Sequence, residues 1–352
     1  MAWGVIRGQG APLKIEVGGT LTPGPPLGHV SGPHIVSNTN EIRARYERAY
    51  ERARRASETS EQMSLVIAIS TRCLFDLEES HEVFLNEGVD AFNLHQLEHR
   101  DQVLGKGVAF GLVRKLLKLK GAVKFVILSS NTPEAGIRVM QSVVHYGLPI
   151  TQAYFTGGGE KFKFLPVLGA HLYLSTDEKE VTKALNAGYA AARVSGSIGS
   201  SGAGKSQTTL ASSVQEPIKI AFDFDRVLCD GISDEFWVKN GMERYKQHEL
   251  ELAEVPLGAG PLKVVMERLV AIRQQFPAQI RLGIFTARGE PANLRVLTTL
   301  RQWKITVDEL FFLDGKPKGT PLATWGADIF FDDSLKNITS ALENNVLGVH
   351  VA

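Results

Sequence analysis

The sequence predicts an α/β fold made of two related units with parallel sheets. From Leu65 onward, short apolar runs alternate with helical patterns, which is typical of parallel strands covered by helices. The runs occur twice in the same order. Without a gap, residues 67–75 (IAISTRCLF) align with residues 220–228 (IAFDFDRVL). Such an internal repeat predicts one structural unit in each half of the chain.

Composition and charge are those of an ordinary globular protein. Of the 352 residues, 43% are hydrophobic and 22% are charged, and the formal net charge is +1. This balance gives no reason to expect a nucleic acid or an anionic membrane as a partner. We find no apolar run typical of a signal peptide or a membrane span. Together with the sparse cysteines, Cys73 and Cys229, this predicts a cytoplasmic protein.

Changes in composition divide the chain into four segments. Residues 1–63 are expected to form an N-terminal arm that is rich in glycine and proline, followed by a charged surface helix. The two α/β units are expected at residues 64–195 and 214–352. Residues 196–213, rich in glycine and serine, are typical of a flexible linker.

The stretch Gly199–Ser206 (GSSGAGKS) within this linker matches the P-loop pattern G-x-x-x-x-G-K-[ST]. In a true P-loop, backbone amides hold phosphates and the lysine, here Lys205, reaches the terminal phosphates. A helix must begin directly after the loop. Residues 207–217 (QTTLASSVQEP) have no helical apolar period and are too few for a crossover helix. We therefore interpret the match as a product of linker composition, with a P-loop NTPase as a rival function.

Acidic side chains follow two apolar runs of the second unit. Asp223 and Asp225 end the run IKIAFDFD, and Asp332 and Asp333 end the run DIFFDD. The C-terminal ends of parallel strands form the ligand-binding edge of an open sheet. Carboxylates gathered there repel one another unless a cation is bound, and their oxygens suit Mg²⁺. The sequence therefore predicts a magnesium site at this edge.

Two other elements supply groups that bind phosphate. Thr286 ends the run IRLGIFT and offers a hydroxyl donor, whereas the stretch KPKG offers the point charges of Lys316 and Lys318. In the repeat alignment Lys161 falls opposite Lys318, which favours Lys318 and leaves Lys316 as the alternative.

The four motifs DFDRV, FTAR, PKG and FFDD resemble, in this order, those of the haloacid-dehalogenase superfamily of phosphatases. The stretches FDFDRVL, LGAGPLK and FTGGGEKFKFL are similar to the type I cytosolic 5′-nucleotidases, and this resemblance covers about residues 64–350. It implies two haloacid-dehalogenase-like (Rossmannoid) units, with a small cap inserted at about residues 226–283 of the second. It also implies Mg²⁺-dependent hydrolysis of nucleoside 5′-monophosphates of the AMP/IMP or deoxynucleotide type.

The resemblance and the chemistry together assign roles. Asp223 is expected to attack phosphorus and form an aspartyl-phosphate, and Asp225 to protonate the leaving ribose oxygen and then activate water. Thr286 and Lys318 are expected to bind the phosphoryl oxygens. The expected Mg²⁺ ligands are Asp223, the backbone carbonyl of Asp225, Asp332 and Asp333.

Several residues have simpler interpretations. Asp333 would instead cap the helix that follows it, a common role for aspartate. We interpret Arg288 as the partner of a surface acid rather than a clamp on phosphate or base. His248 is interpreted as a packing or capping residue. Asp230 either orients the loop after the nucleophile or is solvated. The aromatic candidates for stacking on a base, with core packing as the alternative, are Phe236, Trp237 and Tyr245.

The first unit lacks the groups that perform the chemistry, although Ser129 and Lys161 remain. We expect it to be catalytically silent and to brace the second unit, line the nucleotide pocket or bind an effector. The residues that the alignment places opposite Asp223, Asp225, Asp332 and Asp333 are Ser70, Arg72, Ser175 and Thr176.

Three rival functions remain: a phosphatase of the same fold for another small phosphomonoester, the P-loop NTPase, and a nucleotide sensor without activity. The intact acidic set of the second unit argues against the sensor. The expected partner is a nucleoside monophosphate, with no nucleic acid and no membrane. A nucleotide effector and a homo-oligomer are left open.

Overall fold

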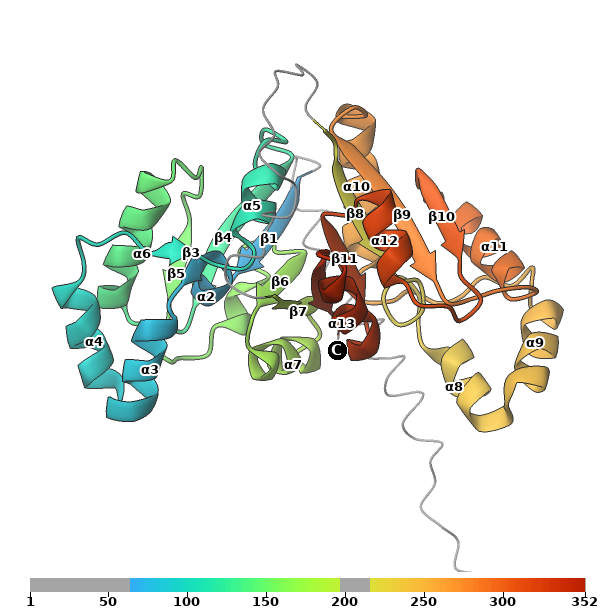
Figure 1. Cartoon of the computed structure of the whole chain (residues 1–352), viewed down its shortest axis with the longest axis horizontal. Coiled ribbons are helices and arrows are strands. Elements are labelled where there is room, and N and C mark those ends of the chain that lie inside the picture. The colour runs from blue at the N-terminus through green and yellow to red at the C-terminus, as the bar shows by residue number, and fades with distance from the viewer. Residues whose placement is uncertain (1–63, 197–215, 352) are drawn as a thin grey trace, which may run out of the picture. The chain divides into compact units, whose positions relative to one another are not determined.

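The computed structural model describes residues 64–196 and 216–351 (Figure 1). The predicted arm and helix of residues 1–63 lie outside the described residues, as does the P-loop-like stretch Gly199–Ser206. None of the helices in the two described ranges has both the length and the apolar character that crossing a membrane requires.

A mostly parallel sheet of 10 strands forms the centre of the described residues. The antiparallel pair is β7 with β12, and all other neighbours in this sheet are parallel. An α/β fold with a mostly parallel sheet is therefore confirmed. A separate small sheet pairs β2 (Phe75–Asp76) with β3 (Gly105–Lys106). The strands of the large sheet are β1 (Leu65–Ile69), β4 (Val123–Ser129), β5 (Ala153–Phe155), β6 (Leu172–Ser175), β7 (Ala191–Ser195), β8 (Ile218–Phe222), β9 (Ile280–Thr286), β10 (Glu309–Phe312), β11 (Ile329–Asp332) and β12 (Leu347–His350).

The two halves of the chain order their strands in the same way. The sheet reads β10-β9-β8-β11-β12-β7-β6-β1-β4-β5. In each half the first strand of the chain therefore lies between the second and the fourth. The halves join where β7 pairs with β12, with Val194 opposite Val349.

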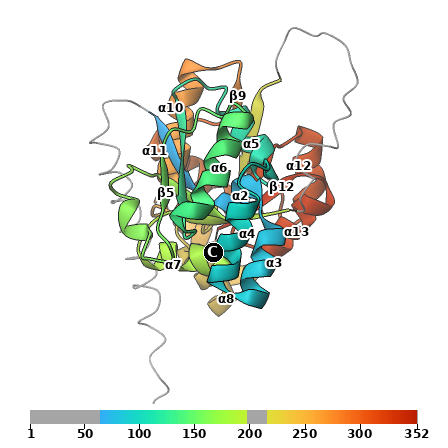
Figure 2. The same ribbon diagram turned by 90° about the vertical axis from the view of Figure 1, so that its left-hand side faces the viewer.

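Helices pack on both faces of the sheet (Figures 1 and 2). One large apolar cluster, which includes residues of α5, α6, α10 and α11, covers one face across both halves. On the other face, α7 packs on the first half, and α12 and α13 pack on the second. The helices are α2 (Thr71–Leu74), α3 (Glu78–Glu87), α4 (Val89–Glu98), α5 (Phe110–Leu116), α6 (Pro133–His145), η1 (Phe162–Phe164), α7 (Glu178–Asn186), α8 (Ile232–Asn240), α9 (Met242–Glu251), α10 (Lys263–Gln275), α11 (Asn293–Trp303), α12 (Gly319–Trp325) and α13 (Leu335–Glu343).

A pair of helices follows the first strand of each half. These pairs are α3 with α4 and α8 with α9, seen at the lower left and lower right of Figure 1. Gly88 and Gly241 join the two helices of each pair, with φ of 90° and 80°. Glycine adopts this conformation at little cost, so each pair can turn sharply. Within the predicted cap of residues 226–283, α8 and α9 form the helix pair, whereas α10 packs on the sheet.

In each half a glycine touches the backbone that follows the first strand. Gly107 donates its N–H to the carbonyl oxygen of Leu74 at 3.0 Å, and Gly260 donates to that of Leu228 at 2.8 Å. A Cβ on Gly260 would lie 2.4 Å from the carbonyl oxygen of Cys229, and one on Gly107 would lie 2.7 Å from the carbonyl carbon of Leu74. These are backbone atoms that cannot rotate away, so neither position has room for a side chain.

We expect Gly260→Ala to lower the free energy of unfolding by about 3 kcal/mol, because the new methyl group overlaps the backbone. Gly121→Ala is the matched control. Gly121 has φ of +77° and no atom within 4 Å of an added Cβ. Gly121→Ala should lower the free energy of unfolding by only about 1 kcal/mol, which is the strain of alanine in a left-handed backbone conformation. Urea unfolding measures both values, and equal losses would contradict the close contact at Gly260.

A buried histidine lies just before β6. His171 is 2% exposed, and its Nδ1 accepts the backbone N–H of Val66 at 3.1 Å. The ring must therefore be neutral, with its proton on Nε2. Burial and, next, the charge of Arg268 lower the pKa of His171 from 6.5 to about 4.

Stability should consequently fall as the pH is lowered through the window from 6.5 to about 4. In this window the imidazole takes up a proton in the unfolded chain but not in the folded one, so acid favours unfolding. From neutral pH to about pH 5 the expected loss is about 2 kcal/mol. Urea unfolding at both pH values measures it. In His171→Asn, whose amide oxygen still accepts the N–H of Val66, this loss should shrink; an unchanged loss would assign it to other groups.

Candidate functional site

The predicted acidic residues lie at the C-terminal edge of the sheet, at the point where the strand order reverses. Asp223 directly follows β8, and Asp332 is the last residue of the neighbouring strand β11. The next strand along the chain, β9, lies on the other side of β8. In open α/β sheets, ligands bind at such a switch point. The N–H of Asp223 bonds the carbonyl oxygen of Phe331 at 2.7 Å, which fixes the two strand ends together.

Lys318 joins the two aspartates. Its Nζ lies 2.7 Å from Asp223 Oδ1 and 2.7 Å from Asp332 Oδ2, and the residue is 1% exposed. Burial alone would lower the pKa of this ammonium, but Asp223 and Asp332 outweigh it and hold the pKa above its usual value. Lys316, the alternative, is exposed. The structure thus places Lys318 in the cluster, as the repeat alignment favours.

Three carboxylates gather around this lysine. One oxygen each of Asp223, Asp332 and Asp333 lies within 4.8 Å of the others. Burial is the main cause that raises the pKa of Asp223 well above its usual range, and Asp332 and Asp225 raise it further. Burial and then the charge of Asp332 raise the pKa of Asp333 to about 7. The cluster thus sets three acidic side chains against the single ammonium of Lys318.

The N-cap interpretation of Asp333 does not hold, because the residue at the N-cap of α13 is Ser334. The N–H of Ser334 bonds to Asp332 Oδ1 at 2.7 Å. Asp333 instead directs its carboxylate towards Arg226, whose Nε lies 3.8 Å away.

Thr286 lies at the end of β9, beside β8, and is fully buried. Its Oγ1 accepts the backbone N–H of Arg288 at 3.1 Å. The hydroxyl therefore lies at the same edge of the sheet as Asp223, and the turn after the strand fixes its orientation.

Asp225 makes a two-point ion pair with Arg288. Arg288 Nε lies 2.8 Å from Asp225 Oδ2, and Nη2 lies 2.7 Å from Oδ1. Arg288 is 4% exposed, so the interpretation of this arginine as the partner of a surface acid is wrong. Burial would raise the pKa of Asp225, but Arg288 outweighs this and holds it below its usual value.

Glu249 and Arg295 were missed by sequence reasoning. Glu249 of α9 is fully buried and binds Arg288 Nη1 through Oε2 at 2.5 Å. Its Oε1 accepts Arg295 Nη1 at 2.9 Å and the hydroxyl of Ser233 at 2.8 Å. Only the position of Arg288 had a signal in the sequence: in FTAR it lies two residues after Thr286, which predicts that it is near the same edge of the sheet. Nothing in the polar stretch MERYKQHELE marks Glu249 as buried.

The remaining candidates have different surroundings in the structure. His248 stacks on Phe236 with ring centroids 3.9 Å apart, in line with the packing interpretation. Asp230 is buried, and its Oδ1 accepts the N–H of Ile232 at 3.4 Å, so it is not a solvated surface residue. Trp237 is 45% exposed.

In the first half, the corresponding lysine is paired differently. Lys161 is 3% exposed, and its Nζ lies 2.5 Å from Glu180 of α7. Glu180 also accepts the hydroxyls of Tyr173 at 2.6 Å and Ser175 at 2.7 Å. Glu180 therefore supplies, from a helix, the carboxylate that two strand ends supply in the second half. Among the described residues, a group of three potential metal ligands occurs only at Asp223, Asp332 and Asp333.

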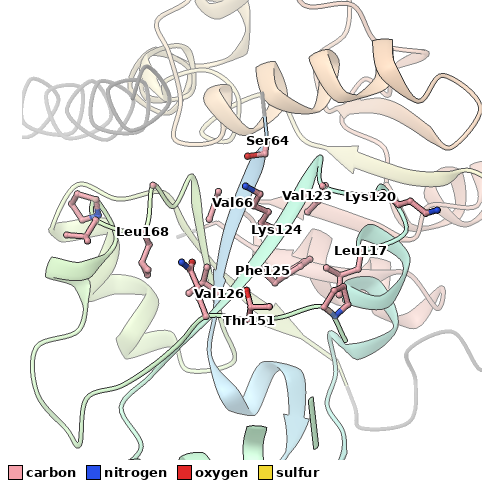
Figure 3. Close-up of a pocket in the computed structure, with 16 residues that line it drawn as sticks. Ser64, Val66, Leu117, Lys120, Val123, Lys124, Phe125, Val126, Thr151 and Leu168 are labelled. Carbon is pink, nitrogen blue, oxygen red and sulfur yellow. The ribbon is translucent and has the colours of Figure 1, made fainter. Parts of the chain in front are cut away.

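A pocket of about 760 Å³ lies elsewhere, at the N-terminal ends of β1 and β4 (Figure 3). Val66, Val123 and Phe125 line it together with the loop that contains Thr151. None of the predicted site residues takes part in it.

Comparison with known proteins agrees with this geometry. The family model described as 5′-nucleotidase matches residues 57–352. Human cytosolic 5′-nucleotidase 1B is 30% identical over 297 residues, which cover 79% of this chain and 47% of the relative. The chain thus spans about half the length of this relative. The family match extends over most of the chain and includes every residue of the acidic cluster, and the chain belongs to the 5′-nucleotidase family.

Proposed function

We propose that the chain is a Mg²⁺-dependent enzyme that hydrolyses nucleoside 5′-monophosphates to nucleoside and phosphate. The observation that carries the proposal is the buried arrangement of Asp223, Lys318 and Asp332 at the switch point of the sheet. Membership of the 5′-nucleotidase family supports the substrate class, with AMP, IMP or deoxynucleotides as candidates. The absence of a membrane-spanning helix among the described residues fits a cytoplasmic enzyme.

Asp223 is the proposed nucleophile. Its Oδ1 accepts the N–H of Phe224 at 2.7 Å as well as Lys318 Nζ, so one oxygen is held while the other remains available to attack phosphorus. The bond formed is Asp223 O–P, and the bond broken is that between phosphorus and the ribose O5′. Water then cleaves the aspartyl-phosphate and regenerates the carboxylate.

Lys318 and Thr286 are proposed to bind the phosphoryl oxygens. Lys318 brings a fixed positive charge next to the attacking oxygen, and Thr286 adds a hydroxyl donor from the neighbouring strand. Fixed donors in a buried site stabilise developing charge more strongly than solvent does. Asp225 is ionised beside Arg288 in the free enzyme. It is therefore proposed to take up a proton from the monoanionic phosphate monoester as this binds, to pass that proton to the leaving O5′, and then to take a proton from the attacking water.

The residues present fit a divalent cation. Asp223, Asp332 and Asp333 offer oxygen ligands within one small space, and the backbone carbonyl of Asp225 is a fourth candidate. Burial first, and then the neighbouring carboxylates, raise the pKa values of Asp223 and Asp333, and a bound cation would oppose both effects by favouring the ionised forms. When bound, Mg²⁺ would neutralise charge on the phosphoryl group and favour the ionised form of the nucleophile.

The two halves are proposed to be related haloacid-dehalogenase-like units, the first of them silent. Their common strand order and the equivalent contacts of Gly107 and Gly260 support this relation. The first half pairs its buried Lys161 with Glu180, and Arg72 stands where the second half has an acidic residue. The helix pair α8–α9 is the proposed cap of the second unit.

We expect Asp223→Asn to lower phosphate release by about 10⁴-fold or more, because the nucleophile is lost. Release is measured from AMP, IMP, CMP, UMP and their deoxy forms, with Mg²⁺ and with EDTA. Wild type should be active only with the metal. Lys205→Ala is the matched control and should retain full activity.

Two outcomes would contradict the proposal. Undiminished release by Asp223→Asn would exclude the aspartyl-phosphate route. Turnover of ATP that is lost in Lys205→Ala, without release from any monophosphate, would establish the rival P-loop function. Release from sugar phosphates but not from nucleotides would keep the mechanism and change the substrate.

A further inference from the structure

A row of four buried charges leads from α11 to Asp225 and includes one residue of the helix pair α8–α9. In order they are Arg295, Glu249, Arg288 and Asp225, and each is at most 9% exposed. Signs alternate along the row, and every neighbouring pair is an ion pair at 2.5 to 2.9 Å. Removing one charge of the row would leave its neighbour buried without a partner, which is strongly destabilising, so the four side chains depend on one another.

Arg288 has no freedom to turn within this row. Its Nε and Nη2 bind both oxygens of Asp225, and its Nη1 binds Glu249. A planar guanidinium bonded on two sides fixes the direction of the carboxylate that it holds. The backbone N–H of Arg288 is also held by Thr286 Oγ1 at 3.1 Å, so the arginine is anchored at both its ends.

Glu249 ties this arginine to the helix pair. It lies on α9, and its Oε1 binds Ser233 of α8 and Arg295 of α11. Any movement of α9 relative to the sheet must therefore either carry Arg288 with it or break a buried ion pair.

We infer that Arg288 is a positioning residue for Asp225, and that Glu249 makes this positioning depend on the seating of the α8–α9 helix pair. The inference rests on the proposed role of Asp225 as acid and base. Three of the five N–H donors of Arg288 are bound by the carboxylates of Asp225 and Glu249, and the inferred role requires no contact with the phosphoryl group. It acts through Asp225, and Glu249 acts through Arg288.

The test compares Arg288→Lys, which keeps the charge and loses the two-point contact, with the isosteric Glu249→Gln. Arg273→Met is the matched control, because Arg273 binds Asp308 at 2.9 Å at the opposite edge of the sheet. With a nucleoside monophosphate, Arg288→Lys should lower kcat by about 10²-fold and Glu249→Gln by about 10-fold. KM should change by less than about threefold, since binding groups are untouched.

A second substrate separates positioning from structure. p-Nitrophenol is a good leaving group that needs no proton, so its release in the first turnover of p-nitrophenyl phosphate should change by less than about twofold. A double-mutant cycle gives an independent measure: in an Asp225→Asn background, Arg288→Lys should cost nothing further.

Equal losses with both substrates, or additive losses in the cycle, would overturn the inference and leave Arg288 with a structural or phosphate-binding role. Circular dichroism and thermal unfolding check that each variant folds. If Arg288→Lys does not fold, the comparison of substrates is made with Glu249→Gln alone. Where p-nitrophenyl phosphate is not cleaved, the cycle decides alone. Failure of the proposed function is distinguishable, because Asp223→Asn would then keep the activity of wild type.

Discussion

The second half is organised around one buried ammonium group, that of Lys318 between Asp223 and Asp332. A lysine with 1% exposure is stable only if carboxylates meet it at bonding distance. These carboxylates come from two strand ends, and the lysine comes from the start of α12. The strand order that makes β8 and β11 neighbours is therefore a condition for burying this charge. The same order places a third acid, Asp333, close to two carboxylates that share the single charge of Lys318, and the three together offer oxygen ligands for a metal ion.

The first half also pairs a buried lysine with a carboxylate, although its strand ends lack the acidic residues of the second half. Lys161 is also buried, yet neither strand end there supplies an acid, and Glu180 of α7 replaces them. Tyr173 and Ser175 complete the hydrogen bonds of Glu180. The buried lysine is paired, but Ser70 stands where the repeat alignment places the proposed nucleophile Asp223. The buried charge of this lysine can therefore be balanced without carboxylates at the strand ends.

Sequence patterns predicted the α/β fold and the meeting of Asp223, Asp332 and Lys318, because apolar runs and strand-end residues are local signals. The partner of Arg288 was not predictable in this way. Glu249 lies in a helix of mostly polar sequence, and its burial depends on Arg295, Ser233 and Arg288 from three other segments. The pairing of β7 with β12 is equally non-local, since nothing in either strand specifies which edge it joins.

The pairing of β7 with β12 shows how the first half supports the second. β12 lies next to β11, and the N–H of Val351 bonds the carbonyl oxygen of Asp332 at 2.9 Å. Without β7, β12 would be an open edge, free to fray or to pair with another chain. Fraying would loosen the strand end that holds Asp332 against Lys318. Because the apolar cluster on one face also runs across both halves, the first half supports the strand end on which the buried ion pair of Lys318 and Asp332 depends.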